Sequence, residues 1–449
     1  PPRRPLRLRP RSAAARPPPS AAFRRRAPSA FVRRGYNGGA TEGETPVNEA
    51  NSQMSTLEGR LAAAARAVAP LVVEHRRALH RIPELAFEER ETAAYVERTL
   101  RGLALAPRVG IAGTGIAVEL PGAGPGPTVL LRADMDGLPL DEVDGRDLRS
   151  AHPGRMHACG HDAHVAAALG AAHALARLGG ERLPGRIVLL FQPGEEHGAG
   201  GKRVVETGLL DEMGVDFALA MHVWSFLDRG RAIVPAGPTT ASSNEFQVTL
   251  TARGGHAAAP HLAHDLVLAA AQLVAALHTV VSRDVDPLKP AVLSIGHLAA
   301  GDTHNILPGK ALLRGTLRAA DQETRTTLIR RVHELAAAVA AAHGAQADVF
   351  VSEGYLATVN DARVAEALAG AARTALGAEA VAPGPMTMVA EDFSFIADAR
   401  PAALMLLGMS DPRRGTDAPH HSPRFLVDDD VPPIGLEILL RAAARLMER

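Results

Sequence analysis

The chain has 449 residues, and its 49 lysines and arginines balance its 49 aspartates and glutamates, so no net field favours a nucleic acid or a membrane surface. Hydrophobic residues make up 46% and aromatic residues only 3%, which supplies a large core built on Ala, Leu and Val. Cys159 is the only cysteine, which excludes a disulfide within the chain and indicates a reducing, intracellular compartment.

The first 40 residues differ from the rest in composition. They are rich in arginine and proline and contain no acidic residue before Glu42. Such a leader suits a transit peptide for a chloroplast or mitochondrion; the alternatives are a disordered tail, a mis-assigned start or an RNA-binding arm. Without an organelle address, the expected location is the cytoplasm. We assign residues 1–54 to this leader and a linker and exclude them from the fold.

Downstream of the leader, short apolar runs alternate with helical stretches. We expect strands at 115–120, 128–132, 187–191 and 216–220, and helices at 88–103 and 164–178. This alternation predicts an α/β layer with a largely buried sheet. The longest uncharged apolar run, 266–281, is shorter than the ~20 residues of a membrane span and indicates a buried helix instead.

The pattern changes near residue 240. Strands are expected at 245–251, 291–298, 311–318 and 348–351, with helices at 265–281 and between Asp321 and Gly344. This β-α-β-β-α-β order is ferredoxin-like. The α/β pattern resumes with helices at 361–376 and 434–447 and a strand at 403–407. The sequence therefore predicts a catalytic domain (55–238 and 355–449) interrupted by a small domain (239–354).

The densest group of chemically active residues is His157-Ala-Cys159-Gly-His161-Asp162-Ala-His164. Thiolate and imidazole are ligands that zinc, manganese or cobalt accept. A lone buried cysteine is usually inert packing, but the flanking histidines favour a metal site here.

Further polar residues follow the expected strands. Glu195-Glu196 comes after 187–191, His222 after 216–220, and Arg132-Ala-Asp134-Met-Asp136 after the strand at 128–132. Each is ambiguous alone, and a lone Glu-Glu pair is commonly a solvated turn. Because open α/β sheets place their sites beyond the carboxyl ends of strands, the convergence predicts an active site. One glutamate can bind metal while the other acts as general base.

Eight strings in fixed order carry a specific resemblance: LLRADMDGLPL, HPGRMHACGHDAHV, LLFQPGEEHGAGG, AMHVW, RGGHAAAPH, HNILPG, AEDFSF and HHSPRF. From about residue 70 to the C-terminus, the chain resembles the metallo-aminoacylase family, which includes hippurate hydrolases, N-acyl-L-amino acid amidohydrolases and plant indole-acetyl (IAA)-amino acid hydrolases. The resemblance implies a co-catalytic metallopeptidase-type catalytic domain with an inserted ferredoxin-like dimerisation or lid domain.

The resemblance also implies roles for individual residues. The implied ligands of one or two divalent ions (manganese or zinc, with cobalt as an alternative) are Cys159, His161, Glu196, His222 and His421. Glu195 matches the general base. His256 matches a histidine that contacts the substrate carbonyl and can come from a partner subunit, and Asn305 and Arg318 lie where related enzymes hold the substrate carboxylate. We expect Asp136 and Asp162 to orient the ligands.

The implied reaction is hydrolysis of an N-acyl-L-amino acid to a carboxylic acid and a free amino acid. A dipeptidase or carboxypeptidase with the same metal core is the alternative, although no group that recognises a charged α-amine can be assigned. A catalytically silent metal-binding protein is a further alternative, but Glu195 and every implied ligand are present. The expected partners are the small substrate and a second copy through the inserted domain, with no nucleic acid and no membrane.

Overall fold

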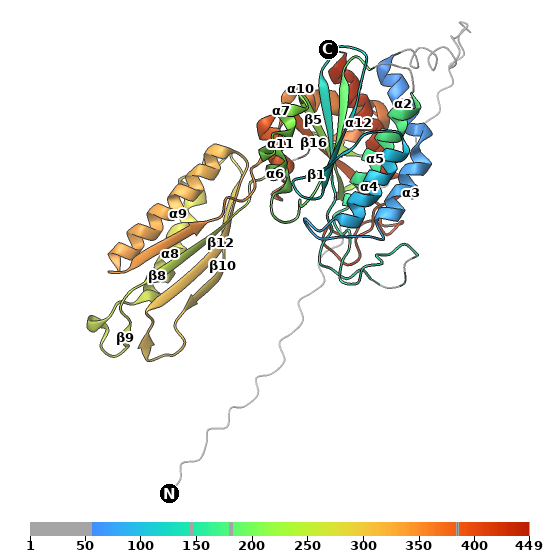
Figure 1. Ribbon diagram of the computed structural model, residues 1–449. Coiled ribbons are helices and arrows are strands. Elements are labelled where there is room, and N and C mark those ends of the chain that lie inside the picture. Colours follow the sequence, from blue (N-terminus) through green and yellow to red (C-terminus); the bar gives the residue numbers. More distant parts are fainter. Residues whose placement is uncertain are drawn as a thin grey trace, which may run out of the picture. The chain divides into compact units, whose positions relative to one another are not determined.

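The computed structural model describes residues 56–143, 145, 147–178, 183–382, 384 and 386–448. The leader and linker assigned to residues 1–54 lie outside the described residues. The described residues form an α/β catalytic domain and an inserted α+β domain (Figure 1). The fold class expected from the sequence is thereby confirmed, including the ferredoxin-like insertion.

The catalytic domain is built on an eight-stranded sheet in the order β1-β2-β4-β3-β5-β16-β6-β15. The four central strands run parallel to one another, so their carboxyl ends lie at the same edge of the sheet; in spatial order they are β4, β3, β5 and β16. The strands are β1 (Arg108–Ile111), β2 (Gly115–Leu120), β3 (Thr128–Asp134), β4 (Arg186–Gln192), β5 (Phe217–Asp228), β6 (Ala232–Ile233), β15 (Val381–Ala382) and β16 (Ala402–Ser410).

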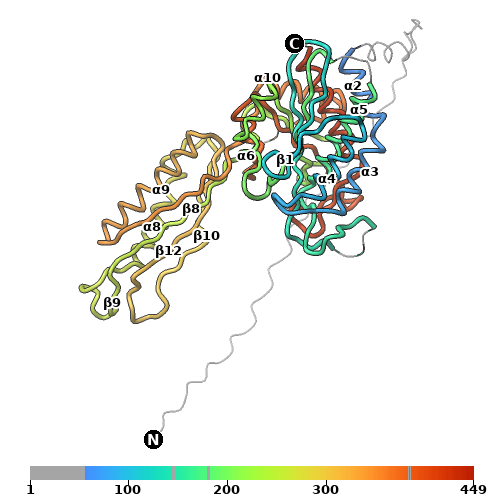
Figure 2. The backbone as a smooth tube through the Cα atoms, in the orientation of Figure 1, coloured from blue at the N-terminus to red at the C-terminus, as the bar shows by residue number. Residues whose placement is uncertain are grey.

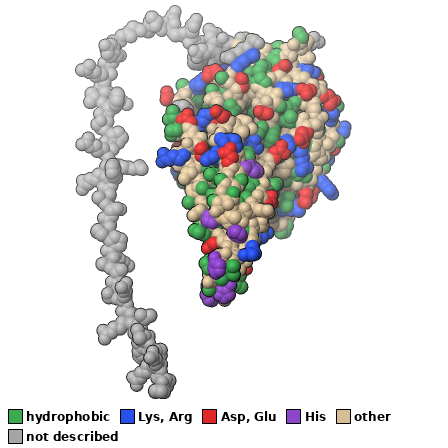
Figure 3. Space-filling view, turned by 90° about the vertical axis from the view of Figure 1, so that its left-hand side faces the viewer, with side chains coloured by type: hydrophobic (Ala, Val, Ile, Leu, Met, Phe, Trp, Pro, Cys, Tyr) green, Lys and Arg blue, Asp and Glu red, His purple; other side chains and the backbone are tan. Residues whose placement is uncertain are grey.

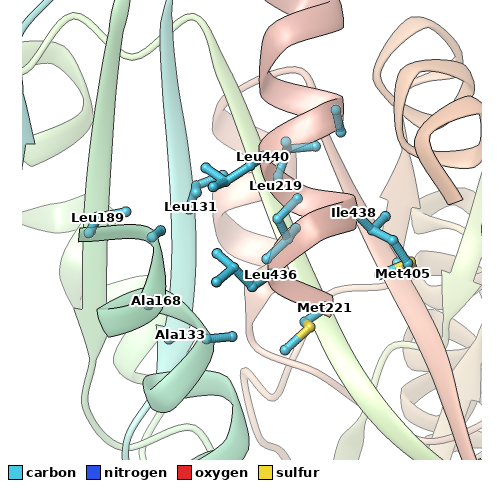
Figure 4. Packing of buried hydrophobic residues seen from close by; sticks show 14 of the residues in the cluster. Leu131, Ala133, Ala168, Leu189, Leu219, Met221, Met405, Leu436, Ile438 and Leu440 are labelled. Atoms are coloured by element: carbon cyan, nitrogen blue, oxygen red, sulfur yellow. The ribbon is translucent and has the colours of Figure 1, made fainter. Parts of the chain in front are cut away.

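Helices cover both faces of this sheet because its central strands are apolar on both sides. Along β3, Leu131 and Ala133 belong to one hydrophobic cluster, whereas Leu130 belongs to another on the opposite face. Figure 4 shows part of the first cluster, with Leu440 and Leu436 of the C-terminal helix and Leu131 of the sheet among its members. Its helices are α2 (Leu57–Ala67), α3 (Ala69–Leu79), α4 (Arg90–Gly102), α5 (His161–Arg177), α10 (Ala362–Leu376) and α12 (Val431–Met447). The other face carries α6 (Gly200–Glu206), α7 (Leu209–Glu212) and α11 (Phe393–Ala399).

The inserted domain has a four-stranded antiparallel sheet in the order β10-β12-β8-β13, with two helices packed on one face (Figure 2). In chain order its elements are β8 (Asn244–Thr251), α8 (Leu266–Arg283), β10 (Ala291–Ala300), β12 (Lys310–Ala319), α9 (Gln322–Ala342) and β13 (Gln346–Val351). Asp265 and Asp321 cap the two helices by accepting backbone N–H groups. In the part of the chain that the structure describes, no helix packs on the opposite face of this sheet.

Short elements complete the structure. A two-stranded sheet of β7 (Gly237–Thr240) and β14 (Thr358–Asn360) lies where the chain leaves and re-enters the catalytic domain. A second one, of β9 (Gly255–His256) and β11 (Ile306–Leu307), extends the inserted domain. Two 3-10 turns lie at Pro260–Leu262 and Ala378–Ala380.

Two expected boundaries differ in ways that affect the site. The expected strand 216–220 continues as β5 to Asp228, because Val223 and Trp224 still pair with β16. His222 therefore lies within a strand and not after one. The expected helix 164–178 begins three residues earlier, since Gly160 adopts a left-handed conformation and lets α5 start at His161.

Helix α8 is long and apolar enough to cross a membrane by length and composition alone, the one such helix in the described part of the chain. One of its faces packs on the inserted sheet through residues such as Leu273 and Leu277, so α8 forms part of the hydrophobic core of the inserted domain. Its other face leaves Val267 and Leu268 about half exposed. Within the described residues, Val267 and Leu268 form an exposed apolar patch at the start of that face.

Candidate active site

The parallel strands bring the predicted site residues to one edge of the catalytic sheet. Asp134 ends β3 and Asp136 follows two residues later, while Glu195 and Glu196 follow β4. His222 points from β5 toward the same place, where its ring lies 6.0 Å from that of His161. This is the position at which open α/β sheets carry their sites.

Cys159 and His161 are presented by the turn that starts α5. Gly160 has φ +90°, and a Cβ atom there would lie 2.4 Å from a methyl carbon of Val223. Only glycine tolerates both the conformation and the close approach. The turn brings the Cys159 sulfur to 3.4 Å from Nε2 of His222.

Two histidines have their tautomers fixed by acceptors on Nδ1. His161 Nδ1 lies 2.9 Å from the carbonyl oxygen of Asp136, and His222 Nδ1 lies 2.7 Å from the carbonyl oxygen of Val223. A carbonyl can only accept, so each Nδ1 carries a proton, and Nε2 is the nitrogen left to bind a metal. This arrangement is typical of metal-binding histidines.

Glu196 and His421 complete the group. His421 Nε2 is 3.3 Å from Glu196 Oε1, which in turn is 4.0 Å from His161 Nε2. Ligand atoms of Cys159, His161 and His222 lie within 4.8 Å of one another, and so do those of Cys159, Glu196 and His421. The two triads share the cysteine and together contain all five implied ligands.

The neighbouring histidines each have one ring nitrogen bonded to a backbone N–H, although His420 Nδ1 also lies 3.9 Å from the Cys159 sulfur. His420 Nε2 accepts the backbone N–H of Ser225 at 3.1 Å, and His164 Nε2 accepts that of Val223 at 3.0 Å. His164 Nδ1 also pairs with Asp134 at 2.5 Å. Of the consecutive pair His420 and His421, only the latter presents a nitrogen to Glu196.

Unpaired atoms and surplus negative charge show that this donor set fits a cation. His161 Nε2 is buried without a hydrogen-bond partner among the described residues, and Glu196 Oε1 has only the ion-pair contacts to His421 and His161. Burial, and then the nearby carboxylates of Glu196 and Glu195, raise the pKa of the Cys159 thiol well above its usual range. Burial lowers the pKa of His161, but Asp134 and Asp136 outweigh it and raise that pKa to about 10. A divalent cation would reverse this balance and favour thiolate and neutral imidazole.

Asp136 connects three parts of the site. Its carboxylate accepts the backbone N–H groups of Glu195 at 3.1 Å and Glu196 at 2.9 Å, and its Oδ1 lies 3.3 Å from His161 Nδ1. Asp162 behaves differently, since it lies 2.9 Å from His80 Nδ1 and accepts Arg76 Nη1 at 3.3 Å. The structure thus places Asp136, and not Asp162, against an implied ligand side chain.

Glu195 is a buried carboxyl group surrounded by other acids. Its Oε1 accepts the backbone N–H of Asp392 at 3.3 Å, and its own carbonyl accepts the hydroxyl of Tyr355 at 2.6 Å. Burial, followed by the charge of Glu391, raises the pKa of Glu195 well above its ordinary value. A carboxyl group with a raised proton affinity can take and return a proton near neutral pH.

The sequence reasoning missed the buried network behind this carboxyl. Arg132 donates to Asp134 at 2.7 Å, to Glu391 at 2.9 Å and to Asp392 at 2.7 Å. Glu391 and Asp392 belong to the string AEDFSF, which was singled out without a role for either residue. Consecutive acids in a buried segment were the available signal, but their partner Arg132 lies some 260 residues away in the sequence.

A pocket of about 1030 Å³ opens over these residues. Its lining includes Glu195 and all the implied ligands except His161. It also includes apolar side chains such as Trp224 and Phe226, and Arg318 of the inserted domain. Arg318 is half-buried, and its guanidinium makes no hydrogen bond or ion pair with any other described residue, although the charge of Glu245 acts on it. Burial lowers its pKa, and Glu245 partly offsets this effect.

His256 and Asn305 lie elsewhere. His256 pairs with Ile306 between β9 and β11, and the backbone N–H of Ala257 donates to the Asn305 carbonyl at 3.0 Å. Both residues are exposed, and neither lines the pocket. In Figure 3, histidine side chains lie toward the narrow lower end of the molecule. Within one chain, then, the structure brings Arg318 to the site but not these two residues.

Comparison with known proteins agrees with this geometry. Residues 130–445 match peptidase family M20/M25/M40. The chain is 35% identical to the N-acetyl-L-cysteine deacetylase of Bacillus subtilis (91% of this chain, 92% of the relative) and 36% identical to IAA-amino acid hydrolase ILR1-like 5 of Arabidopsis thaliana (83% and 86%). It is 33% identical to thermostable carboxypeptidase 1 of Saccharolobus solfataricus (82% and 94%). A crystal structure described as a dinuclear metal-binding peptidase from Bacillus subtilis superposes with a TM-score of 0.74 at 28% identity, covering 85% of this chain and 99% of that one.

Proposed function

The chain belongs to peptidase family M20/M25/M40 and is a metal-dependent amide hydrolase, and on that basis we propose that it hydrolyses N-acyl-L-amino acids to a carboxylic acid and a free amino acid. The observation that carries the proposal is Arg318, an unpaired guanidinium in the pocket that contains Glu195. A guanidinium without a protein partner suits the carboxylate of an amino acid. Trp224 and Phe226 line the same pocket and suit an apolar or aromatic acyl group.

We further propose that two divalent ions, manganese or zinc and alternatively cobalt, are held by the two triads that share Cys159. Bound ions would lower the pKa of a water molecule and polarise the amide carbonyl. Glu195 takes a proton from the attacking water and later gives it to the amide nitrogen. The C–N bond breaks with its electron pair on nitrogen, so the products are the acid and the free amine.

The role of Glu195 has a direct test. Glu195→Gln removes the proton acceptor but keeps Glu196 and the other ligands, so turnover should be lost while bound metal is unchanged. Elemental analysis of the purified variant supplies the metal content. A variant that kept more than a small fraction of wild-type turnover would contradict the assignment.

His256 is the proposed second group at the carbonyl, supplied by a partner subunit. It lies on an extension of the inserted domain and does not line the pocket of its own chain. The exposed apolar side chains of Val267 and Leu268 on α8 suit a homodimer contact in the same domain. His256→Ala should lower turnover on the order of 100- to 1,000-fold with metal content unchanged.

Mixing two inactive variants distinguishes the routes by which His256 could act. In a dimer of one His256→Ala chain and one Glu195→Gln chain, action across the interface leaves one site intact and restores activity. Action within a chain leaves every site defective. Full activity of His256→Ala alone would remove the residue from the mechanism.

A substrate screen tests the proposed function as a whole. Hippurate, N-acetyl amino acids and indole-acetyl amino acids are assayed with metal-free protein supplied with manganese, zinc or cobalt. The alternative, a dipeptidase or carboxypeptidase, gains some support from Glu245, which lines the pocket and can bind a cationic group. Free dipeptides and N-blocked peptides therefore belong in the screen. Turnover of peptides alone would replace the proposal with this alternative.

For the location, we propose that residues 1–40 act as a removable organelle address, on the grounds of their arginines and missing acids. A reporter fused to this segment should enter a chloroplast or mitochondrion. A diffuse cytoplasmic signal in a eukaryotic host would contradict the proposal.

A further inference from the structure

Glu391 is a buried carboxylate in the pocket with one oxygen unused. The side chain is 2% exposed and lies among the pocket-lining residues. Its Oε1 accepts Arg132 Nη2 at 2.9 Å and the backbone N–H of Phe393 at 3.0 Å. Its Oε2 is buried and has no hydrogen-bond partner among the described residues. A buried charged acceptor left without a donor is costly, so a donor is expected there when substrate is bound.

Glu391 belongs to a group of buried acids that includes the proposed base. One carboxylate oxygen from each of Glu195, Glu391 and Asp392 lies within 4.8 Å of the other two. Two oxygens at such a separation can both lie about 2.9 Å from one nitrogen placed between them.

Asp392 is fully engaged by other donors. It accepts hydrogen bonds from Arg132, from Gln192 and from the backbone N–H of Gly201, and it does not line the pocket. Glu391 is therefore the acid beside Glu195 that has an acceptor to offer a ligand.

We propose that Glu391 is a further catalytic residue, whose free oxygen accepts the N–H of the scissile amide. This hydrogen bond would fix the nitrogen between Glu391 and Glu195 while the carbonyl carbon is attacked. When Glu195 gives its proton to the nitrogen and the C–N bond breaks, the electron pair stays on nitrogen. The Glu391 carboxylate then faces an amine that gains positive charge, which it stabilises more than the neutral amide.

The inference predicts a preference that metal and base alone do not impose. A secondary amide carries the required N–H, whereas an ester has no hydrogen at the corresponding atom. Glu391 should therefore assist hippurate but not its oxygen analogue, O-benzoylglycolate. The inference rests on the proposed function only in the choice of this pair of probes.

Glu391→Gln converts the acceptor into a donor with little change of shape. Arg132 and the Phe393 N–H both donate to the position of Oε1, so they retain the amide oxygen there and leave the NH₂ group at the position of Oε2. The specificity constant for hippurate should fall on the order of 10- to 100-fold, the usual effect of losing a charged hydrogen bond. Hydrolysis of the ester should change by less than about threefold, and bound metal should match wild type.

Two further variants control the comparison. Glu391→Asp keeps the charge but withdraws the acceptor by one methylene, and it should give a smaller loss with the same selectivity for the amide. Glu206→Gln makes the same chemical change at an exposed side chain paired with Lys202, and it should leave both substrates unaffected.

Three results would overturn the inference: equal loss on amide and ester, loss of bound metal, or no loss at all. Equal loss would show that Glu391 acts only through the Arg132 network, and metal loss would show that it is a ligand. If wild-type enzyme does not cleave hippurate, the proposed substrate is wrong. The same comparison is then made with the amide that the enzyme does cleave and its ester analogue, so the two failures remain distinguishable.

Discussion

Replacing Asp136 by asparagine should weaken metal binding without removing a ligand. The two carboxylate oxygens of Asp136 accept the backbone N–H groups of Glu195 and Glu196, and one of them lies near His161 Nδ1. Asparagine keeps only one acceptor oxygen. In either orientation its NH₂ group faces a backbone N–H that can only donate, so one hydrogen bond to a charged acceptor is lost and one buried donor is left unpaired.

The size of the effect follows from that lost hydrogen bond. A hydrogen bond to a charged group contributes about 1.5–3 kcal/mol, and each 1.4 kcal/mol corresponds to about a tenfold change in affinity. Metal affinity of Asp136→Asn should fall about 10- to 100-fold, in the range usual for residues that orient ligands. The assay titrates metal-free protein with manganese or zinc and follows both activity and bound metal.

Asp162→Asn is the matched control. It makes the same change at an equally buried aspartate, whose partners are His80 and Arg76 and not a ligand side chain. Its melting temperature should fall while its metal affinity stays near that of wild type. The reasoning fails if Asp136→Asn binds metal as tightly as wild type, or if both variants weaken metal binding equally.

Three further outcomes are expected. Tyr355→Phe removes the hydroxyl that donates to the Glu195 carbonyl, so kcat should fall up to about tenfold with KM nearly unchanged; an unchanged kcat would separate this contact from catalysis. Cys159→Ser should lose activity at low metal concentration and recover part of it at high concentration, and a chelator should lower the melting temperature of wild type more than that of the variant. Burial lowers the pKa of His80, but Asp162 outweighs it and raises that pKa to about 9, above the ordinary 6.5. The resulting stabilisation is complete below about pH 6.5 and is lost as pH rises through about 9, so thermal melts from pH 6 to 10 should decline more steeply for metal-free wild type than for His80→Gln.

The inserted domain shows how far periodicity alone can predict a fold. Its strands alternate in hydrophobicity, and each helix begins at a capping aspartate, Asp265 or Asp321, that accepts backbone N–H groups. These local features fix the order of elements, and the ferredoxin-like arrangement follows from that order. In the catalytic domain, the ends of β5 could not be predicted from local periodicity, because they depend on pairing with β16, which lies some 180 residues away in the sequence.

The metal cluster was predictable for a chemical reason. Cys159 and His161 lie two residues apart, and few arrangements of thiol and imidazole at that spacing serve packing alone. The orientation of each side chain was not predictable, since it depends on contacts such as the carbonyl of Asp136 at His161 Nδ1. For the same reason Asp162, which adjoins His161 in the sequence, turns out to contact His80 instead.

Two residues that a family resemblance assigns to the same substrate need not lie in the same site within one chain. His256 and Arg318 were both expected at the substrate, yet only Arg318 lines the pocket, because β12 presents it on the open face of the inserted sheet. His256 lies on the separate β9–β11 extension. A substrate contact by His256 therefore requires either movement of the inserted domain or a second copy of the chain. The exposed apolar side chains of Val267 and Leu268 on α8 favour the second copy, because burying them between two chains would stabilise a dimer, whereas movement within one chain leaves them exposed to water.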